Sequence, residues 1–137
     1  MIVFTAYGIP KGQPRARATI RGKHAGVYDP GTADGWKAIV VMAGRPHRPE
    51  APLDGPLRVC IDLFFPRPKR LMRKCDPDEA IWMTSKPDRD NCEKAILDAL
   101  TQDGWWYDDA QVCDGFVRKQ YVPKGGCPCA VIWVDRL

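Results

Sequence analysis

The sequence predicts an α/β fold of the α+β type, with one mixed β-sheet of about four strands and two main helices. Segments rich in β-branched and aromatic residues alternate along the chain with two segments whose apolar residues recur at helical spacing. The resulting order, strand–helix–strand–helix–strand–strand, favours one sheet with helices packed on it. The chain has 137 residues, of which 45% are hydrophobic, so we expect a single domain over residues 1–137.

The first half of the chain predicts one strand, one long loop and one helix. IVFTAYG, residues 2–8, is β-rich, and the glycine-, proline- and arginine-rich residues 9–31 predict a loop with a hairpin at RGKHAG. A helix is expected over residues 32–43, with Thr32 or Asp34 as its N-cap. Its buried stripe would consist of Trp36, Ile39, Val40 and Ala43.

The second half begins with the clearest strand, LRVCIDLFF at residues 57–65, in which apolar residues recur with β-sheet spacing. A proline-rich, basic loop follows over residues 66–87. The next helix is expected from about residue 90 to residue 102, with Asp90 as its N-cap. Its apolar stripe consists of Cys92, Ala95, Ile96, Ala99 and Leu100.

Two strands are expected at the end of the chain. QVCDGFVRKQYV, residues 111–122, and CAVIWVDRL, residues 129–137, are both β-rich. KGGCP lies between them and has turn composition. The two segments therefore predict a terminal hairpin.

Basic residues are concentrated in two segments, which favours a polyanionic partner. The net charge of +4 is modest, but residues 1–28 and 67–74 each carry five basic residues and no acidic residue. These basic residues are Lys11, Arg15, Arg17, Arg21 and Lys23, then Arg67, Lys69, Arg70, Arg73 and Lys74. The alternative is that both segments are simply solvated loops.

The six cysteines do not have the spacing of a zinc knuckle, because no two of them are separated by two residues. A zinc site at Cys113, Cys127 and Cys129 is an alternative, and disulfides are less expected than zinc. No run of 18 apolar residues predicts a transmembrane helix, and no basic leader precedes the first apolar run. We therefore expect no membrane partner and a reducing cytoplasmic location.

Acidic residues gather around the second helix and predict a metal site. In an extended backbone Asp88 and Asp90 would point to the same side, and Mg²⁺ would neutralise their mutual repulsion. Asp108 and Asp109 could supply a third carboxylate, while Lys94 could contact a phosphate. Each residue also has an ordinary structural interpretation. Asp90 could be a helix cap, the Asp108–Asp109 pair a turn, and Lys94 the partner of Asp98 in a surface ion pair.

Residues 86–112, KPDRDNCEKAILDALTQDGWWYDDAQV, resemble the RusA family of Holliday-junction resolvases. The shared pattern is a proline, two aspartates one residue apart, an asparagine, a lysine, Asp-Ala-Leu and a glycine–aromatic turn ending in Asp-Asp-x-Gln. The Pro-Arg-x-Arg element at residues 14–17 resembles longer phage and prophage members, and KGG at residues 124–126 fits a late turn of the family.

The resemblance implies a homodimeric, Mg²⁺-dependent endodeoxyribonuclease, with Mn²⁺ able to substitute, acting in DNA recombination and repair. Such an enzyme cuts four-way junctions with paired, symmetric nicks. The metal-binding acids of the family would correspond to Asp88, Asp90 and Asp109, and its catalytic lysine to Lys94. Supporting roles would fall to Asn91, Asp98 and Asp108. Contacts to the DNA backbone would come from Lys11, Arg15, Arg17, Arg67, Lys69, Arg70, Arg73 and Lys74.

The chain departs from the family pattern in two places. Cys92 replaces a customary leucine, and the basic loop at residues 67–74 is longer than in short members. Two rival functions stay open: a nuclease acting on flaps, forks or duplex DNA, and a non-catalytic DNA-binding module. Trp105 and Trp106 either close the core or stack on unpaired bases.

Overall fold

The computed structural model describes residues 1–28 and 30–137. Its main sheet runs in the order β1-β8-β4-β7-β5, and β6 pairs with β4 off this path. The strands are β1 (Ile2–Tyr7), β4 (Leu57–Phe65), β5 (Ile81–Trp82), β6 (Val112–Asp114), β7 (Val117–Tyr121) and β8 (Cys129–Arg136). The helices are α1 (Asp34–Gly44) and α2 (Arg89–Gln102), with short 3₁₀ turns η1 (Arg45–His47), η2 (Lys69–Leu71) and η3 (Asp109–Gln111).

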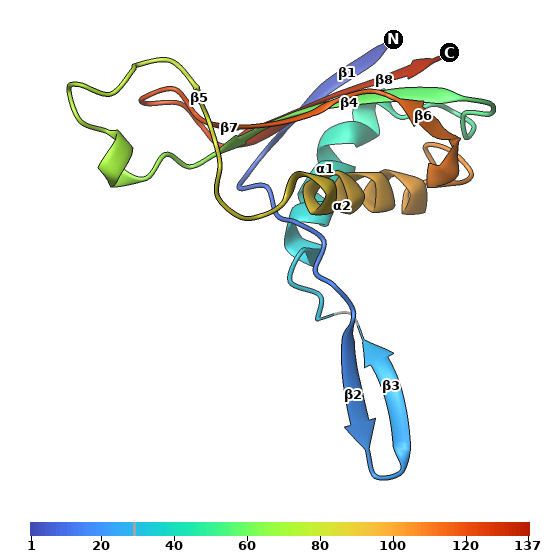
Figure 1. Ribbon diagram of the computed structural model, residues 1–137. Helices are drawn as coiled ribbons and strands as arrows, with labels where there is room; N and C mark the ends of the chain where they lie inside the picture. The colour runs from blue at the N-terminus through green and yellow to red at the C-terminus, as the bar shows by residue number, and fades with distance from the viewer. Residues whose placement is uncertain (29) are drawn as a thin grey trace.

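Both helices lie on the same face of the sheet (Figure 1). The residues of β4 that face them are Leu57, Val59, Ile61, Leu63 and Phe65, all buried. The expected apolar stripe of α2 is buried in the same core, which confirms its helical spacing. The α+β class with two main helices is thus confirmed. The sheet has six strands rather than about four because β5 and β6, of two and three residues, add to the four longer strands.

The terminal hairpin expected from the sequence is wrong. β8 pairs antiparallel with both β1 and β4, whereas β7 pairs in parallel with the other edge of β4. β4 therefore lies between the two segments that were expected to pair. Its burial explains this position, since only Arg58 in the strand is exposed. Alternation along a strand indicates which side chains are buried but not which strand is the neighbour.

The single strand expected over residues 111–122 is also wrong, because η3, β6 and β7 replace it. The break between β6 and β7 includes Gly115, whose φ is +141°. A Cβ atom at this position would lie 1.8 Å from the carbonyl oxygen of Val59 in β4. The backbone approaches β4 so closely that only glycine fits.

The helix ends differ from those expected. α1 begins at Asp34 after Ala33, so neither Thr32 nor Asp34 is its N-cap, and Ile39 is 38% exposed. α2 begins at Arg89 with Asp88 as N-cap, which places Asp90 inside the first turn. Within the described residues, neither α1 nor α2 is both long and apolar enough to span a bilayer.

The hairpin expected at RGKHAG is confirmed as β2 (Arg17–Arg21) and β3 (His24–Tyr28), which form a separate two-stranded sheet. We call residues 17–28 the arm. It projects away from the main sheet beyond the helices (Figure 1). Gly22, with φ of +61°, provides the left-handed conformation at its tip.

Candidate active site

The N-terminal end of α2 presents two carboxylates to solvent. Asp88 has extended backbone angles (φ −68°, ψ 148°) and makes no side-chain cap hydrogen bond, while Asp90 lies in the first helical turn. The expectation that both point to one side of an extended segment is therefore wrong, because Asp90 is helical. Both still lie at the N-terminal end of the helix, where the helix dipole is positive.

Basic groups surround Asp88. The Lys86 ammonium donates to its Oδ1 at 2.8 Å, and this bond lowers the pKa of the Asp88 carboxyl, with further lowering by the charges of Lys86, Lys119 and Arg15. Asp88 is thus fully ionised at neutral pH and suited to a cation or to a cationic side chain.

Lys119 in β7 anchors the segment that leads into α2. Its ammonium donates to the carbonyl oxygens of Ser85 and Pro87, each at 2.6 Å. The sequence did not predict a role for Lys119. Its position in a β-rich segment was the one available signal, and that signal does not identify the start of α2 as its neighbour. Lys119 therefore fixes the position of Asp88 through the backbone.

The segment before the arm closes over the same end of α2. The backbone N–H of Gln13 donates to the backbone carbonyl oxygen of Asn91 at 2.8 Å. A hollow here brings together the expected site residues Arg15, Asp88 and Asn91. The structure thus joins the Pro-Arg-x-Arg element, from the start of the chain, to the Asp-x-Asp-Asn element at the start of α2.

Lys94 and Asp98 lie farther along α2. The Lys94 ammonium contacts Asp98 Oδ1 at 3.2 Å, and the lysine side chain is 60% exposed. Asp90, Lys94 and Asp98 follow one another at intervals of four residues and so share one side of the helix. Lys94 is therefore close in sequence to Asp88 and Asp90, but its ammonium pairs with Asp98 instead of with either of them.

The second acidic pair lies beyond the other end of α2, and one of its two members, Asp108, has a structural role. Asp108 is the N-cap of η3, accepting from the Ala110 amide at 2.9 Å. Gln111 accepts from the Tyr107 and Asp108 amides and donates to the carbonyl oxygens of Leu53 and Gly55. This is a complete capping box. Asp109 is the first residue of η3 and is half-buried.

The two acidic pairs are far apart in one chain. Val112, three residues after Asp109, pairs with Leu57, whereas Lys119, which contacts Pro87, pairs with Leu63. Six steps of extended strand separate Leu57 from Leu63, about 20 Å. Accordingly, within residues 1–28 and 30–137, no three His, Cys, Asp or Glu side chains are grouped to hold a metal. The structure brings together Asp88, Asp90 and Asn91 but not Asp109.

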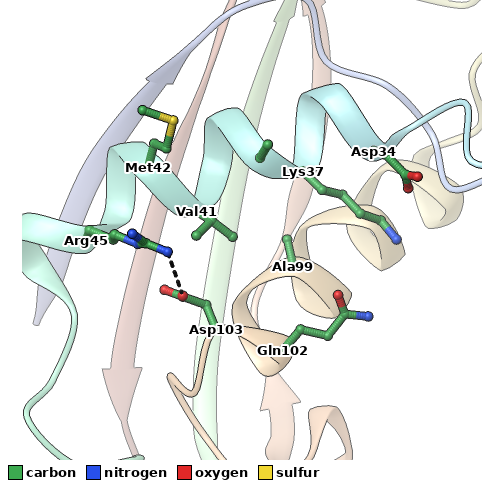
Figure 2. A pocket seen from close by; sticks show the side chains of 9 residues that line it. Asp34, Lys37, Val41, Met42, Arg45, Ala99, Gln102 and Asp103 are labelled. Atoms are coloured by element: carbon green, nitrogen blue, oxygen red, sulfur yellow. Dashed lines mark ion pairs between the residues drawn. The ribbon is translucent and has the colours of Figure 1, made fainter.

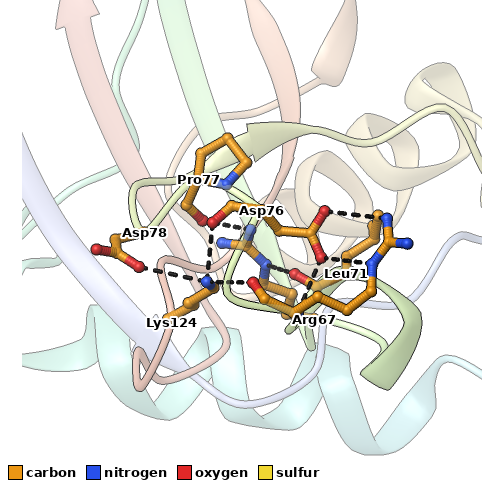
Figure 3. A network of polar contacts seen from close by, with 7 residues as sticks. Arg67, Leu71, Asp76, Pro77, Asp78 and Lys124 are labelled. Carbon is orange, nitrogen blue, oxygen red and sulfur yellow. Dashed lines mark hydrogen bonds and ion pairs between the residues drawn. The ribbon is translucent and has the colours of Figure 1, made fainter.

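The basic loop at residues 67–74 is held by some of its own arginines (Figure 3). Arg67 donates to the carbonyl oxygens of Leu71, Pro77 and Glu79, and Arg73 pairs with Asp76 at 3.2 Å. Lys124, outside the loop, donates to the carbonyl oxygens of Arg73 in the loop and of Asp76 just after it. The side chains of Lys69, Arg70 and Lys74 are exposed, and no hydrogen bond or ion pair joins them to another part of the described chain. These three side chains are therefore available for an external anion.

A second hollow lies between α1 and α2, at the C-terminal end of α2 (Figure 2). Its Asp103 carboxylate already contacts Arg48 at 3.2 Å and Arg45 at 3.9 Å. Asp34, Lys37 and Gln102 complete its polar lining. These charges tie η1 to α2, and we assign no chemistry to this hollow.

Trp105 and Trp106 close the core, as one of the two interpretations predicted. Their side chains are 0% and 1% exposed, and the Trp106 indole donates to Thr101 Oγ1 at 2.6 Å. Neither indole is accessible for stacking on a base. Tyr107 is 67% exposed.

All six cysteines are free thiols. Burial raises the pKa of Cys92, which replaces the customary leucine in the α2 stripe, to about 11. Cys92 therefore remains a neutral, apolar core residue at physiological pH. The described residues contain no group of Cys113, Cys127 and Cys129 arranged to hold zinc.

Comparison with known proteins adds independent information. A family model described as "Endodeoxyribonuclease RusA" matches residues 8–129. The protein YqaN of Bacillus subtilis (strain 168) is 34% identical over 125 residues, covering 88% of this chain and 87% of that protein. The crossover junction endodeoxyribonucleases RusA of Escherichia coli (strain K12) and of Enterobacteria phage 82 are each 42% identical over 67 residues. These alignments cover 48% of this chain and 52% of each enzyme.

Proposed function

The chain belongs to the RusA endodeoxyribonuclease family, and from this we propose that it resolves four-way DNA junctions by paired, symmetric hydrolysis of phosphodiester bonds. The observation that carries the proposal is the family match over residues 8–129, which includes the whole α2 motif. The family and the fold class expected from the sequence are confirmed. We further propose that residues 1–137 act as one endonuclease domain in the cytoplasm of a bacterial or phage-infected cell.

We propose that Asp88 and Asp90 hold Mg²⁺, for which Mn²⁺ can substitute. Two carboxylates at an accessible helix N-terminus fit this ion, which is commonly held by one or two carboxylates together with water and substrate phosphates. When bound, Mg²⁺ would supply a Lewis acid and lower the pKa of water. Lys86, now paired with Asp88, would be released from the carboxylate by the incoming cation.

Lys94 and Asn91 would complete the chemistry on the protein side. Lys94 would exchange its Asp98 contact for a phosphate oxygen and stabilise the charge that develops there. Asp98 would then be a positioning residue that holds Lys94 on the correct side of α2. The Asn91 side chain borders the same hollow as Asp88 and Arg15 and could orient a phosphate or water.

Asp109 can join this site only from a second copy of the chain. The ligands of one Mg²⁺ ion lie about 2 Å from the ion. Within one subunit, however, Asp109 and Asp88 lie near two positions of β4, Leu57 and Leu63, that are roughly 20 Å apart along the strand. We propose a homodimer in which two copies of α2 lie antiparallel about a twofold axis. Each Asp88 end would then meet the Asp109 end of the partner, and Asp108 would position Asp109 through η3.

The proposed DNA surface combines two basic segments. Arg15, which lines the hollow of Asp88, would contact the DNA backbone together with Lys11 and Arg17, its neighbours in sequence. Lys69, Arg70 and Lys74 would do so from the second loop, and Arg67 and Arg73 would contribute by holding that loop in shape. Such contacts favour shape over base sequence.

A substrate comparison tests the function. The protein would be incubated with a synthetic four-way junction, a matching fork and a linear duplex, in Mg²⁺ or EDTA. We expect paired nicks only in the junction, none in EDTA. Equal cutting of all three DNAs would make it a broader nuclease of branched and linear DNA. Tight junction binding without cleavage in Mg²⁺ or Mn²⁺ would leave a DNA-binding module.

A further inference from the structure

The two faces of the arm have opposite character. In a β-hairpin, directly paired residues lie on the same face and alternate positions lie on opposite faces. The pairs Arg21↔His24 and Thr19↔Gly26 share one face with Arg17, and this face is polar and basic. The pairs Ile20↔Ala25 and Ala18↔Val27 form the other face, which is wholly apolar.

The apolar face is open to solvent. Ile20 is 78% exposed and Val27 is 72% exposed. An isolated two-stranded hairpin is only marginally stable in water, and this one pairs with no further strand of the described chain. Exposed Ile20 and Val27 contribute nothing to the core, so their placement on one surface indicates that something else covers them.

The occupant is indicated by charge and position. Residues 15–28 contain Arg15, Arg17, Arg21 and Lys23 and no acidic residue, which fits a polyanion rather than an apolar protein surface. The arm also starts close to the candidate site, because Arg15, two residues before the arm, lines the same hollow as Asp88. A strand of DNA on the arm would therefore lead directly to Asp88 and Asp90.

We propose that the arm distinguishes branched from linear DNA. Its basic face lies along the phosphates, and Ile20 and Val27 pack against the base-pair faces that are left unstacked at a branch point. Linear duplex offers no such apolar surface unless a base step is first opened, as apolar wedge residues do in other DNA-binding proteins. The proposal rests on DNA being the substrate, and it deepens that function by assigning substrate selection to two residues.

The test compares two double variants of the full-length protein. Ile20→Ser/Val27→Ser removes the apolar face, and Arg17→Gln/Arg21→Gln, the matched control, removes charge from the basic face. Binding to a four-way junction and to linear duplex would be measured in EDTA, so that no cleavage occurs, at several salt concentrations. A 2-aminopurine at the branch point would report base stacking. Thermal unfolding and sedimentation equilibrium would establish fold and oligomeric state.

We expect the apolar variant to lose about tenfold in junction affinity, with duplex affinity and salt dependence unchanged and the 2-aminopurine response lost. The basic variant should bind both DNAs more weakly. The slope of log affinity against log salt concentration should decrease in magnitude by about two. Equal binding losses on both DNAs for the apolar variant would overturn the proposal. So would dissociation of a dimer by this variant, since a second copy would then cover the apolar face.

These outcomes are distinct from a failure of the nuclease function. A protein that cuts nothing, but whose junction selectivity depends on Ile20 and Val27, would retain the arm proposal and lose the catalytic one. A nuclease whose junction selectivity is unchanged in the apolar variant would do the reverse.

Discussion

The two ends of α2 carry similar acidic pairs but use them differently. At the C-terminal end, Asp108 is bound within the capping box of η3, beside the buried Trp105 and Trp106. At the N-terminal end, the Asp88 side chain makes no cap hydrogen bond, and its ion-pair partner within residues 1–28 and 30–137 is the exposed Lys86. The first arrangement satisfies the backbone and stabilises the fold, whereas the second leaves charge available to a ligand. The same residue type can therefore mark a structural turn at one helix end and a candidate reactive site at the other.

The largest effect should follow from Asp90→Asn at the N-terminal end. We expect junction cleavage to fall by about a thousandfold, since the proposed Mg²⁺ site loses one of its two carboxylates and the phosphate loses the charge stabilisation that the ion would provide. The free energy of unfolding should change by less than about 1 kcal/mol, because the carboxylate is exposed. Single-turnover cleavage and urea denaturation measure the two quantities. If Asp90→Asn lost much stability but still cleaved junctions, the N-terminal end of α2 would have a structural role instead of a catalytic one.

Trp106→Ala tests the C-terminal end in the opposite sense. The indole is 1% exposed and hydrogen-bonded to Thr101, so its removal should cost about 3–5 kcal/mol of unfolding free energy. Any folded fraction should still bind junction DNA with normal affinity. Urea denaturation, followed by binding measured well below the unfolding midpoint, would separate these effects. Lost affinity in fully folded protein would give this end a direct role in recognition.

Gln111→Ala should have a smaller effect of the same kind. It removes a capping partner that accepts from two amides and donates to two carbonyl oxygens, for an expected loss of about 1–2 kcal/mol. Gln102→Ala is the matched control, because Gln102 is exposed at the end of α2. Equal midpoints for the two variants in thermal unfolding would contradict the structural role of the capping box.

Cys92 gives the smallest effect, and only at high pH. Burial raises the pKa of this thiol from an ordinary 9.0 to about 11 in the folded protein. The neutral thiol therefore contributes fully to the free energy of unfolding below pH 9, and this contribution is lost as the pH rises towards 11. The loss should be on the order of 1 kcal/mol by pH 10. Cys92→Leu should remove this alkaline component, while Cys75→Ser, at an exposed position, should retain it. Parallel pH profiles for all three proteins would count against a buried titrating thiol.

Local sequence patterns predicted much of the fold. The bounds of β4 agree with the alternating LRVCIDLFF segment, and the stripe of α2 agrees with its helical spacing, because burial on one face imposes these periods. The insertion of β4 between β7 and β8, in place of the expected hairpin of these two strands, was not predictable in this way. Pairing is decided by the whole sheet, where the buried β4 takes the central position. The break at Gly115 depends on the backbone of Val59, which is far away in sequence.

The candidate site was predicted in part for the same reason. Asp88, Asp90 and Asn91 are neighbours in sequence and so lie at one helix end in any fold that contains α2. The distance to Asp109 depends on the direction of α2 relative to β4, and that direction is tertiary information. The internal role of Arg67 likewise depends on carbonyl oxygens brought close by the folded loop.

Subunit mixing tests most directly whether a working site joins opposite ends of two α2 helices. Differently tagged Asp90→Asn and Asp109→Asn chains would be co-expressed, and the mixed dimer would be isolated and assayed on a four-way junction. If each site combines Asp88 and Asp90 of one subunit with Asp109 of its partner, the mixed dimer retains one intact site and nicks one strand. A dimer of wild-type with Asp90→Asn/Asp109→Asn should then be inactive. An inactive mixed dimer, together with an active wild-type/double-variant dimer, would contradict the shared site and place all three carboxylates within one chain.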